Sequence, residues 1–169
     1  MFANQGPQFQ GLPPAQRTLP VGLSPRYAAF ALFLREDMRP RGRLTFCNLF
    51  VSAFFEYFGF SGFRGRLAND FDMVARSSRG FVEMGLSEWV TSSPSNQFGF
   101  ACLSGSPHGH VVLLLDSLPS FSPSFECLVP HCVDVGRNYS WDVPISRAFK
   151  SIPKLFKFSP AAPITKAKA

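Results

Sequence analysis

The sequence predicts an α+β domain in which N-terminal helices pack on one face of a small antiparallel β-sheet. Helical patterns occupy the first half of the chain, and strand patterns occupy the second half from residue 97 onward. The two kinds of element do not alternate as they do in doubly wound folds, so an antiparallel sheet is expected. With 169 residues, the chain is long enough to form one domain with a hydrophobic core.

The composition excludes several classes of protein. Hydrophobic residues make up 46% of the chain and 20 residues are Phe, which argues against general disorder. The net charge of +6 suits an anionic polymer such as nucleic acid, acidic lipid or bacterial cell wall. No Lys/Arg run with interleaved aromatic residues precedes the C-terminal tail, so we expect no nucleic-acid partner. No apolar segment reaches the length of a membrane span.

Three segments are expected along the chain. Residues 1–24 are rich in Pro and Gln and predict a flexible arm, residues 25–158 form the domain, and residues 159–169 predict a basic, disordered tail. Residues 1–20 lack the apolar stretch of a signal peptide. We therefore expect a protein made in the cytoplasm that reaches any extracellular target through cell lysis or an injection machine.

Three helices are expected in the first half, each beginning at a capping residue. The second helix is apolar on nearly all sides, so we expect it to be buried at the centre of the domain. Their predicted ranges are 25–38, 46–58 and 69–78, and their caps are Ser24, Thr45 and Asn69.

Alternating and continuous apolar runs predict the strands. The run over 110–115 is apolar on both faces and is expected at the centre of the sheet, whereas the short segment 154–158 is expected at an edge. The other two expected strands cover 98–103 and 127–135.

Cys47 is the candidate nucleophile. It falls in the first turn of the expected central helix, where unpaired backbone N–H groups and the positive end of the helix dipole favour a thiolate. Several cysteine hydrolases hold their nucleophile in this way. The alternative is that Cys47 is a small core residue, as free cysteines often are.

A thiol nucleophile needs a base, and the chain contains three histidines. His110 stands at the start of the expected central strand, directly after Gly109, so a substrate could approach and the strand would fix the direction of the ring. His110 is therefore the preferred base, and His108 and His131 remain alternatives.

A third polar group usually orients the imidazole of such a pair. Asp134, on the neighbouring strand, is preferred because a carboxylate would stabilise the imidazolium; His131 and Asn138 remain alternatives. The oxyanion would be held by the backbone N–H of Cys47 and the side chain of Asn48. Asn48 could equally serve only as a residue of the first helical turn.

No cofactor or metal is expected. The nearest approach to a metal site is the set Cys102, Cys127, His131 and Cys132, whose spacing matches none of the usual zinc motifs. Four irregularly spaced cysteines are also too few for a disulfide framework in a chain of this length, so a reduced protein, or one with at most a single disulfide bridge, is expected.

Four short segments, in order, resemble the NlpC/P60- or CHAP-type cysteine peptidases and amidases, as found in phage lysins and injected peptidoglycan amidase effectors. They are T-F-C-N-L-F-V at 45–51, L-A-N-D-F at 67–71, G-H-V-V at 109–112, and V-D-V-G-R-N at 133–138 followed by R-A-F at 147–149. The chain departs from this family at Phe46, where the family has Trp or Tyr.

The resemblance implies a papain-like fold and hydrolysis of amide bonds in peptidoglycan stem peptides, without a metal. By position it implies Cys47 as nucleophile, His110 as base and Asp134 as third residue, with Asn69 near the cleft. It also implies peptidoglycan as partner, an immunity or inhibitor protein, and action at the cell wall or periplasm.

Two other functions are compatible with the same residues. The first is a cysteine protease, deubiquitinase or thiol acyltransferase that acts on proteins or lipids. The second is a non-enzymatic binding module in which Cys47 and His110 are core residues.

Overall fold

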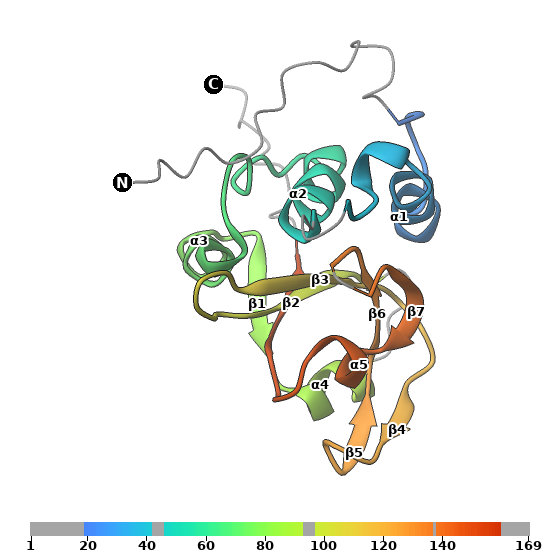
Figure 1. Cartoon of the computed structure of the whole chain (residues 1–169), viewed down its shortest axis with the longest axis vertical. Helices are drawn as coiled ribbons and strands as arrows, with labels where there is room; N and C mark the ends of the chain where they lie inside the picture. The colour runs from blue at the N-terminus through green and yellow to red at the C-terminus, as the bar shows by residue number, and fades with distance from the viewer. Residues whose placement is uncertain (1–18, 42–45, 93–96, 137, 160–169) are drawn as a thin grey trace, which may run out of the picture.

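The computed structural model describes residues 19–41, 46–92, 97–136 and 138–159. Within these ranges the chain forms an antiparallel six-stranded sheet with helices on both faces (Figure 1). The predicted α+β class is confirmed. The described ranges contain no helix that is long and apolar enough to cross a membrane.

The N-terminal helices follow the predicted pattern with shorter bounds. Helix α1 covers Pro25–Phe33 and is followed by a short 3-10 turn at Glu36–Met38, so the expected helix over 25–38 is interrupted. Helix α2 covers Cys47–Tyr57 and begins after Phe46, and the expected Thr45 cap lies outside the described residues. Helix α3 covers Phe71–Ser77, after a 3-10 turn at Ala68–Asp70.

The sheet has the strand order β1-β8-β2-β3-β6-β7. Strand β3 lies within the sheet, between β2 and β6, as its apolar faces indicate. The strands cover β1 Phe81–Met84, β2 Gly99–Leu103, β3 His110–Leu114, β6 His131–Asp134, β7 Ser140–Pro144 and β8 Lys154–Phe158.

The expected strand over 127–135 is in fact two strands in two different sheets. Strand β5, Cys127–Val129, pairs with β4, Ser120–Ser122, in a separate two-stranded sheet, while β6 belongs to the main sheet. The break falls at Pro130, which has no N–H to donate to a ladder.

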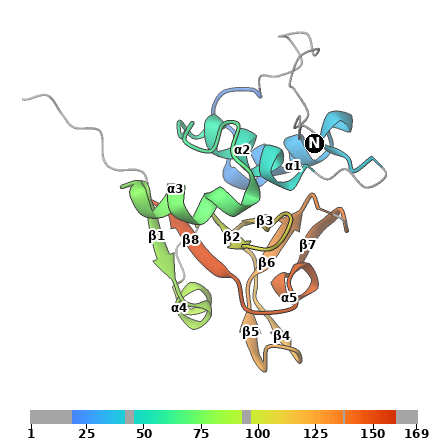
Figure 2. The same cartoon turned by 60° about the vertical axis from the view of Figure 1, so that its left-hand side comes forward.

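Strand β8 was expected at an edge and instead lies inside the sheet, between β1 and β2 (Figure 2). Its residues Leu155 and Phe156 point to opposite faces, and both are almost completely buried. A strand that is apolar on both faces is stabilised when neighbours on either side pair its backbone and helices cover its faces.

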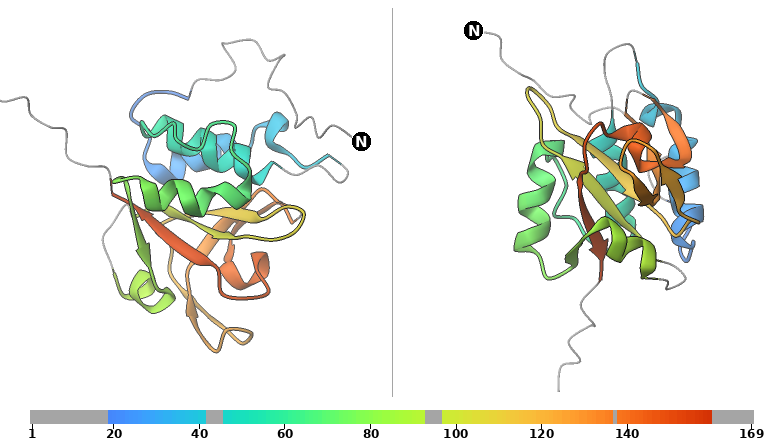
Figure 3. Two further views of the ribbon diagram at one scale, coloured as in Figure 1. Left: turned by 90° about the vertical axis from the view of Figure 1, so that its left-hand side faces the viewer. Right: turned by 90° about the horizontal axis from the view of Figure 1, so that it is seen from below.

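Helices cover both faces of the sheet, whereas the sequence pattern predicts one covered face. Helices α1, α2 and α3 pack on one face, and α4 (Leu86–Thr91) and α5 (Ile145–Ala148) lie on the other (Figure 3). Trp89, Ile145 and Phe149 form a second core there with apolar residues of the strands. The second layer is needed because β2 and β3 are apolar on both sides.

A cluster of phenylalanines fills the space between α2, α3 and the sheet. Phe55 of α2 is fully buried and contacts the rings of Phe63, Phe81 and Phe100, and Phe63 stacks on Phe71 with ring centroids 4.1 Å apart. Such ring pairs add to the free energy gained from burial alone. The cluster therefore fixes α2 against the sheet.

Residues 19–24, the part of the expected N-terminal arm that the structure describes, are attached to the domain. The backbone N–H of Leu23 donates to the hydroxyl of Tyr57 (2.6 Å), and that hydroxyl donates to the carbonyl of Pro20 (2.8 Å). Leu19 and Leu23 also pack against the core. Residues 1–18 and 160–169, the rest of the expected arm and nearly all of the expected tail, lie outside the described residues.

We expect Phe55→Ala to lower the free energy of unfolding by about 3–5 kcal/mol, because it leaves a cavity at the centre of the phenylalanine cluster. Urea unfolding followed by circular dichroism measures the change. The matched control is Phe121→Ala, since Phe121 is 63% exposed on β4. Equal effects of the two substitutions would contradict the central role of the cluster.

Candidate active site

Cys47 is the first residue of α2 and is nearly buried, with 6% of its surface exposed. The following residues Phe50, Val51 and Phe54 are fully buried, so the N-terminal end of the helix is held against β3 (Figure 1). At this position the sulfur lies beside backbone N–H groups that have no partner within the helix. These groups are suitable donors to an oxyanion.

His110 is the first residue of β3, and its imidazole lies between the other two predicted catalytic residues. Its Nε2 is 3.2 Å from Oδ1 of Asp134, the last residue of the neighbouring strand β6. Its ring also interacts with the side chain of Cys47, and this interaction raises the pKa of the imidazole. Helix α2 and strands β3 and β6 therefore bring together Cys47, His110 and Asp134, which are far apart in the sequence.

The proton on His110 is unusually strongly held. Burial pulls the pKa of His110 down, but the interactions of the ring with Asp134 and with Cys47 outweigh it. The pKa of His110 is consequently raised to about 9. An imidazolium beside the sulfur stabilises a negative charge there, which is the pairing a thiolate nucleophile needs.

Asp134 is buried and its carboxylate has two partners. Its Oδ1 faces His110 and also accepts a hydrogen bond of 2.6 Å from the backbone N–H of Gly136. A side chain at Gly136 would collide with the His110 ring and come within 2.7 Å of the Asp134 carboxylate. The site therefore requires glycine at this position for steric reasons.

Gly136 and Phe149 have roles that the sequence analysis did not assign. The ring of Phe149, directly after α5, lies 5.2 Å from the His110 ring between centroids and covers one side of it. Both residues lie in segments that carry the family resemblance, at 133–138 and 147–149, and this resemblance was the signal in the sequence that could have pointed to them. The resemblance does not show that they contact His110.

The two predicted substrate-binding asparagines hold backbone in place. Asn48 donates its amide to the carbonyl of Arg66 (2.8 Å), which ties the start of α2 to the following connection. Asn69 exchanges two hydrogen bonds of 3.0 Å with the backbone N–H and C=O of Gly105. Asn69 thus positions the loop that leads to His110.

The alternative histidines lie elsewhere. His108 is exposed in the loop before β3. His131 hydrogen-bonds to Ser120 through Nε2 (2.9 Å) and to Asp142 through Nδ1 (3.2 Å), and the other oxygen of Asp142 forms an ion pair with Arg26 of α1 (2.6 Å). Because Arg26 neutralises this carboxylate, we interpret the chain of contacts as a structural tie between α1, β7, β6 and β4.

The candidate metal ligands do not form a cluster. Within the described ranges, no group of three or more His, Cys, Asp or Glu residues could hold a metal ion. Cys102 and Cys132 are buried in the two cores on opposite faces of the sheet. All four cysteines are free thiols.

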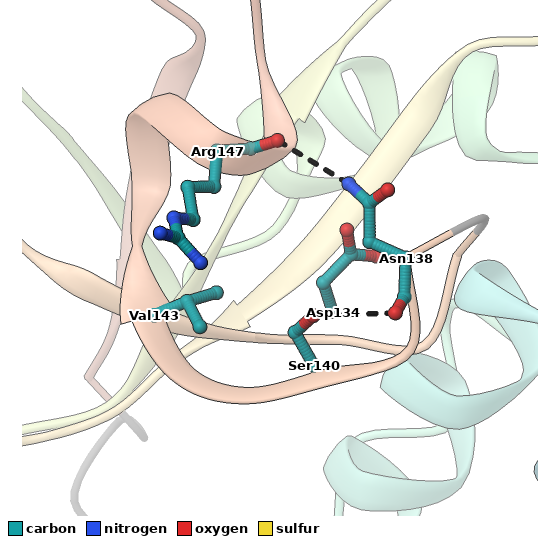
Figure 4. A pocket seen from close by; sticks show the side chains of 5 residues that line it. All are labelled: Asp134, Asn138, Ser140, Val143 and Arg147. Carbon is teal, nitrogen blue, oxygen red and sulfur yellow. Dashed lines mark hydrogen bonds between the residues drawn. The ribbon is translucent and has the colours of Figure 1, made fainter.

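A pocket of about 370 Å³ adjoins the far side of Asp134 (Figure 4). Its walls come from the connection between β6 and β7, from β7 itself and from α5. The amide of Asn138 donates to the carbonyl of Arg147 (3.3 Å), which fixes α5 over the pocket. The lining residues are Asp134, Asn138, Ser140, Val143 and Arg147.

Comparison of the chain with protein-family profiles, with curated protein sequences and with solved structures found no significant match. The chemistry of the site must therefore be inferred from its own geometry.

Substitution Asp134→Asn should lower the pKa of His110 well below 9, because it keeps the shape of the side chain and removes its charge. NMR titration of the imidazole measures this pKa directly. The matched control is Glu126→Gln, an exposed carboxylate on the β4–β5 hairpin, which should leave the pKa unchanged. A His110 pKa that stays near 9 in Asp134→Asn would refute the role given to Asp134.

The same shift has a consequence for stability. Because the folded-state pKa of His110 lies above its ordinary value of 6.5, the protonated ring stabilises the fold below pH 6.5, and this contribution is lost as the pH rises through about 9. The loss between pH 6.5 and 9 should be smaller in Asp134→Asn, as urea unfolding at several pH values will show.

Proposed function

We propose that this protein is a cysteine amidase or endopeptidase of the NlpC/P60 or CHAP type that cleaves amide bonds in peptidoglycan stem peptides. The contact of Cys47, His110 and Asp134 carries this proposal. A helix N-terminus, a strand and its neighbour supply the three side chains, which is the arrangement expected of a papain-like α+β hydrolase.

The geometry supports a two-step hydrolysis. The Cys47 thiolate attacks the peptide carbonyl, and backbone N–H groups at the start of α2 hold the oxyanion. His110 gives its proton to the leaving amine, which leaves a thioester on Cys47. The neutral imidazole then takes a proton from water as that water attacks the thioester, which releases the acid and restores the thiolate and the imidazolium.

Two features support a cell-wall substrate. The four segments that resemble the NlpC/P60 and CHAP families include each of the three catalytic residues of this proposal. The net charge of +6 favours association with an anionic polymer. In this proposal the enzyme acts at the cell wall or in the periplasm after lysis or injection.

We expect Cys47→Ala to reduce the hydrolysis of purified peptidoglycan by about 10³-fold or more, because the nucleophile is removed. Mass spectrometry of the digest identifies the new termini and hence the bond. The matched control is Cys127→Ser on β5, a half-buried thiol outside the site, which should retain full activity. Hydrolysis that persists at full rate in Cys47→Ala would exclude this mechanism.

The same variants separate the alternative functions. Cleavage that depends on Cys47 but occurs only with ubiquitin conjugates or acyl donors would keep the cysteine mechanism and exclude the cell-wall substrate. No turnover of any of these substrates would favour a binding module.

Thiol labelling gives a test that needs no substrate. Burial raises the pKa of Cys102 to about 12 and also raises that of Cys132, so both should react very slowly with iodoacetamide at pH 7. Cys47, beside an imidazolium, should be labelled first, as peptide mass mapping will show. Labelling of Cys47 as slow as that of Cys102 would argue for a structural thiol.

A further inference from the structure

Among the described residues that line the pocket beside Asp134, Arg147 is the only cationic one. It lies in α5, and its side chain extends along the pocket wall toward Val143 (Figure 4). Its backbone carbonyl accepts a hydrogen bond from Asn138, but no hydrogen bond or ion pair joins its guanidinium to another residue of the described ranges. Five N–H donors are therefore available to a ligand.

Each of the other polar side chains of the pocket has at least one partner. The hydroxyl of Ser140 donates to the backbone carbonyl of Asn138 (3.2 Å), and the amide of Asn138 donates to Arg147. The charge of Asp134 is balanced by His110 and by the N–H of Gly136, so this carboxylate does not need Arg147. The free guanidinium decides which ligand the pocket favours.

The pocket adjoins the catalytic residues directly. Asp134 forms part of its wall and also contacts His110. Helix α5 brings Arg147 to the pocket, and two residues later Phe149 lies against the His110 ring. A peptide whose scissile bond lies at Cys47 and His110 can therefore place a neighbouring side chain or terminus in this pocket.

We propose that Arg147 binds a free carboxylate of the peptide substrate in this pocket and so determines which stem peptides are cleaved. This inference rests on the proposed function and goes beyond it, because it names the substrate group that is recognised. A planar guanidinium matches a carboxylate through two parallel hydrogen bonds. A volume of about 370 Å³ accommodates the carboxylate with a short aliphatic arm, for which Val143 offers an apolar wall.

The test compares two stem-peptide fragments that are identical except that the carboxylate next to the scissile bond is either free or converted to a carboxamide. Wild-type protein should show a kcat/KM that is roughly 10- to 100-fold higher for the free carboxylate, as charge-assisted hydrogen bonds provide. Arg147→Gln should abolish this preference through a rise in KM for the free-carboxylate fragment. Arg147→Lys should restore part of it, because Lys offers the charge without the planar fork.

Lys150→Gln is the matched control, since it removes one exposed positive charge three residues along the chain and outside the pocket. It should retain the preference, and a loss as large as that in Arg147→Gln would assign the effect to overall charge and overturn the inference. Calorimetric binding of both fragments to Cys47→Ala protein gives a readout without turnover and should show the same preference.

The outcomes separate the two proposals. Cleavage that depends on Cys47 with equal rates for both fragments would overturn the inference about Arg147 and leave the proposed function intact. A preference for the free-carboxylate fragment that is retained in Arg147→Gln would likewise overturn the inference about Arg147 and leave the proposed function intact. Absence of any cleavage dependent on Cys47 would overturn both.

Discussion

The packing of α2 between its neighbouring helices and the sheet determines where the candidate site lies. Phe50, Phe54 and Phe55 are fully buried in the same core, and the ring of Phe55 contacts aromatic side chains from β1, β2 and β8. A helix held on so many sides cannot rotate or slide without opening cavities, which are costly. The first residue of that helix, Cys47, is consequently fixed over β3, the strand that begins at His110.

Packing positions the residues of the candidate site, and charge compensation between Asp134 and His110 then determines the protonation of the imidazole. A buried carboxylate is unfavourable unless it is paired, and Asp134 is paired with the N–H of Gly136 and with His110. The negative charge of Asp134 stabilises the protonated imidazole. The pKa of His110 is therefore raised to about 9, although burial opposes this shift. The same carboxylate therefore orients the ring and sets its protonation state.

The second layer of helices links the stability of the sheet to the pocket beside Asp134. Strands that are apolar on both faces need cover on both, and α5 provides part of it through Ile145 and Phe149. The position of this short helix also places Phe149 on His110 and Arg147 in the pocket beside Asp134. The packing of the second core and the shape of the pocket beside Asp134 thus depend on the same four-residue helix.

The sequence by itself determined the α+β class, the start of the central helix near Cys47 and the candidates His110 and Asp134, because caps, apolar runs and strand parity are local signals. The tertiary structure alone decided that β8 lies between β1 and β2, that Pro130 divides two sheets, and that Gly136 and Arg147 adjoin the candidate site. These features depend on contacts between distant segments, such as Phe100 paired with Phe156, and no local pattern specifies which apolar strand pairs with which.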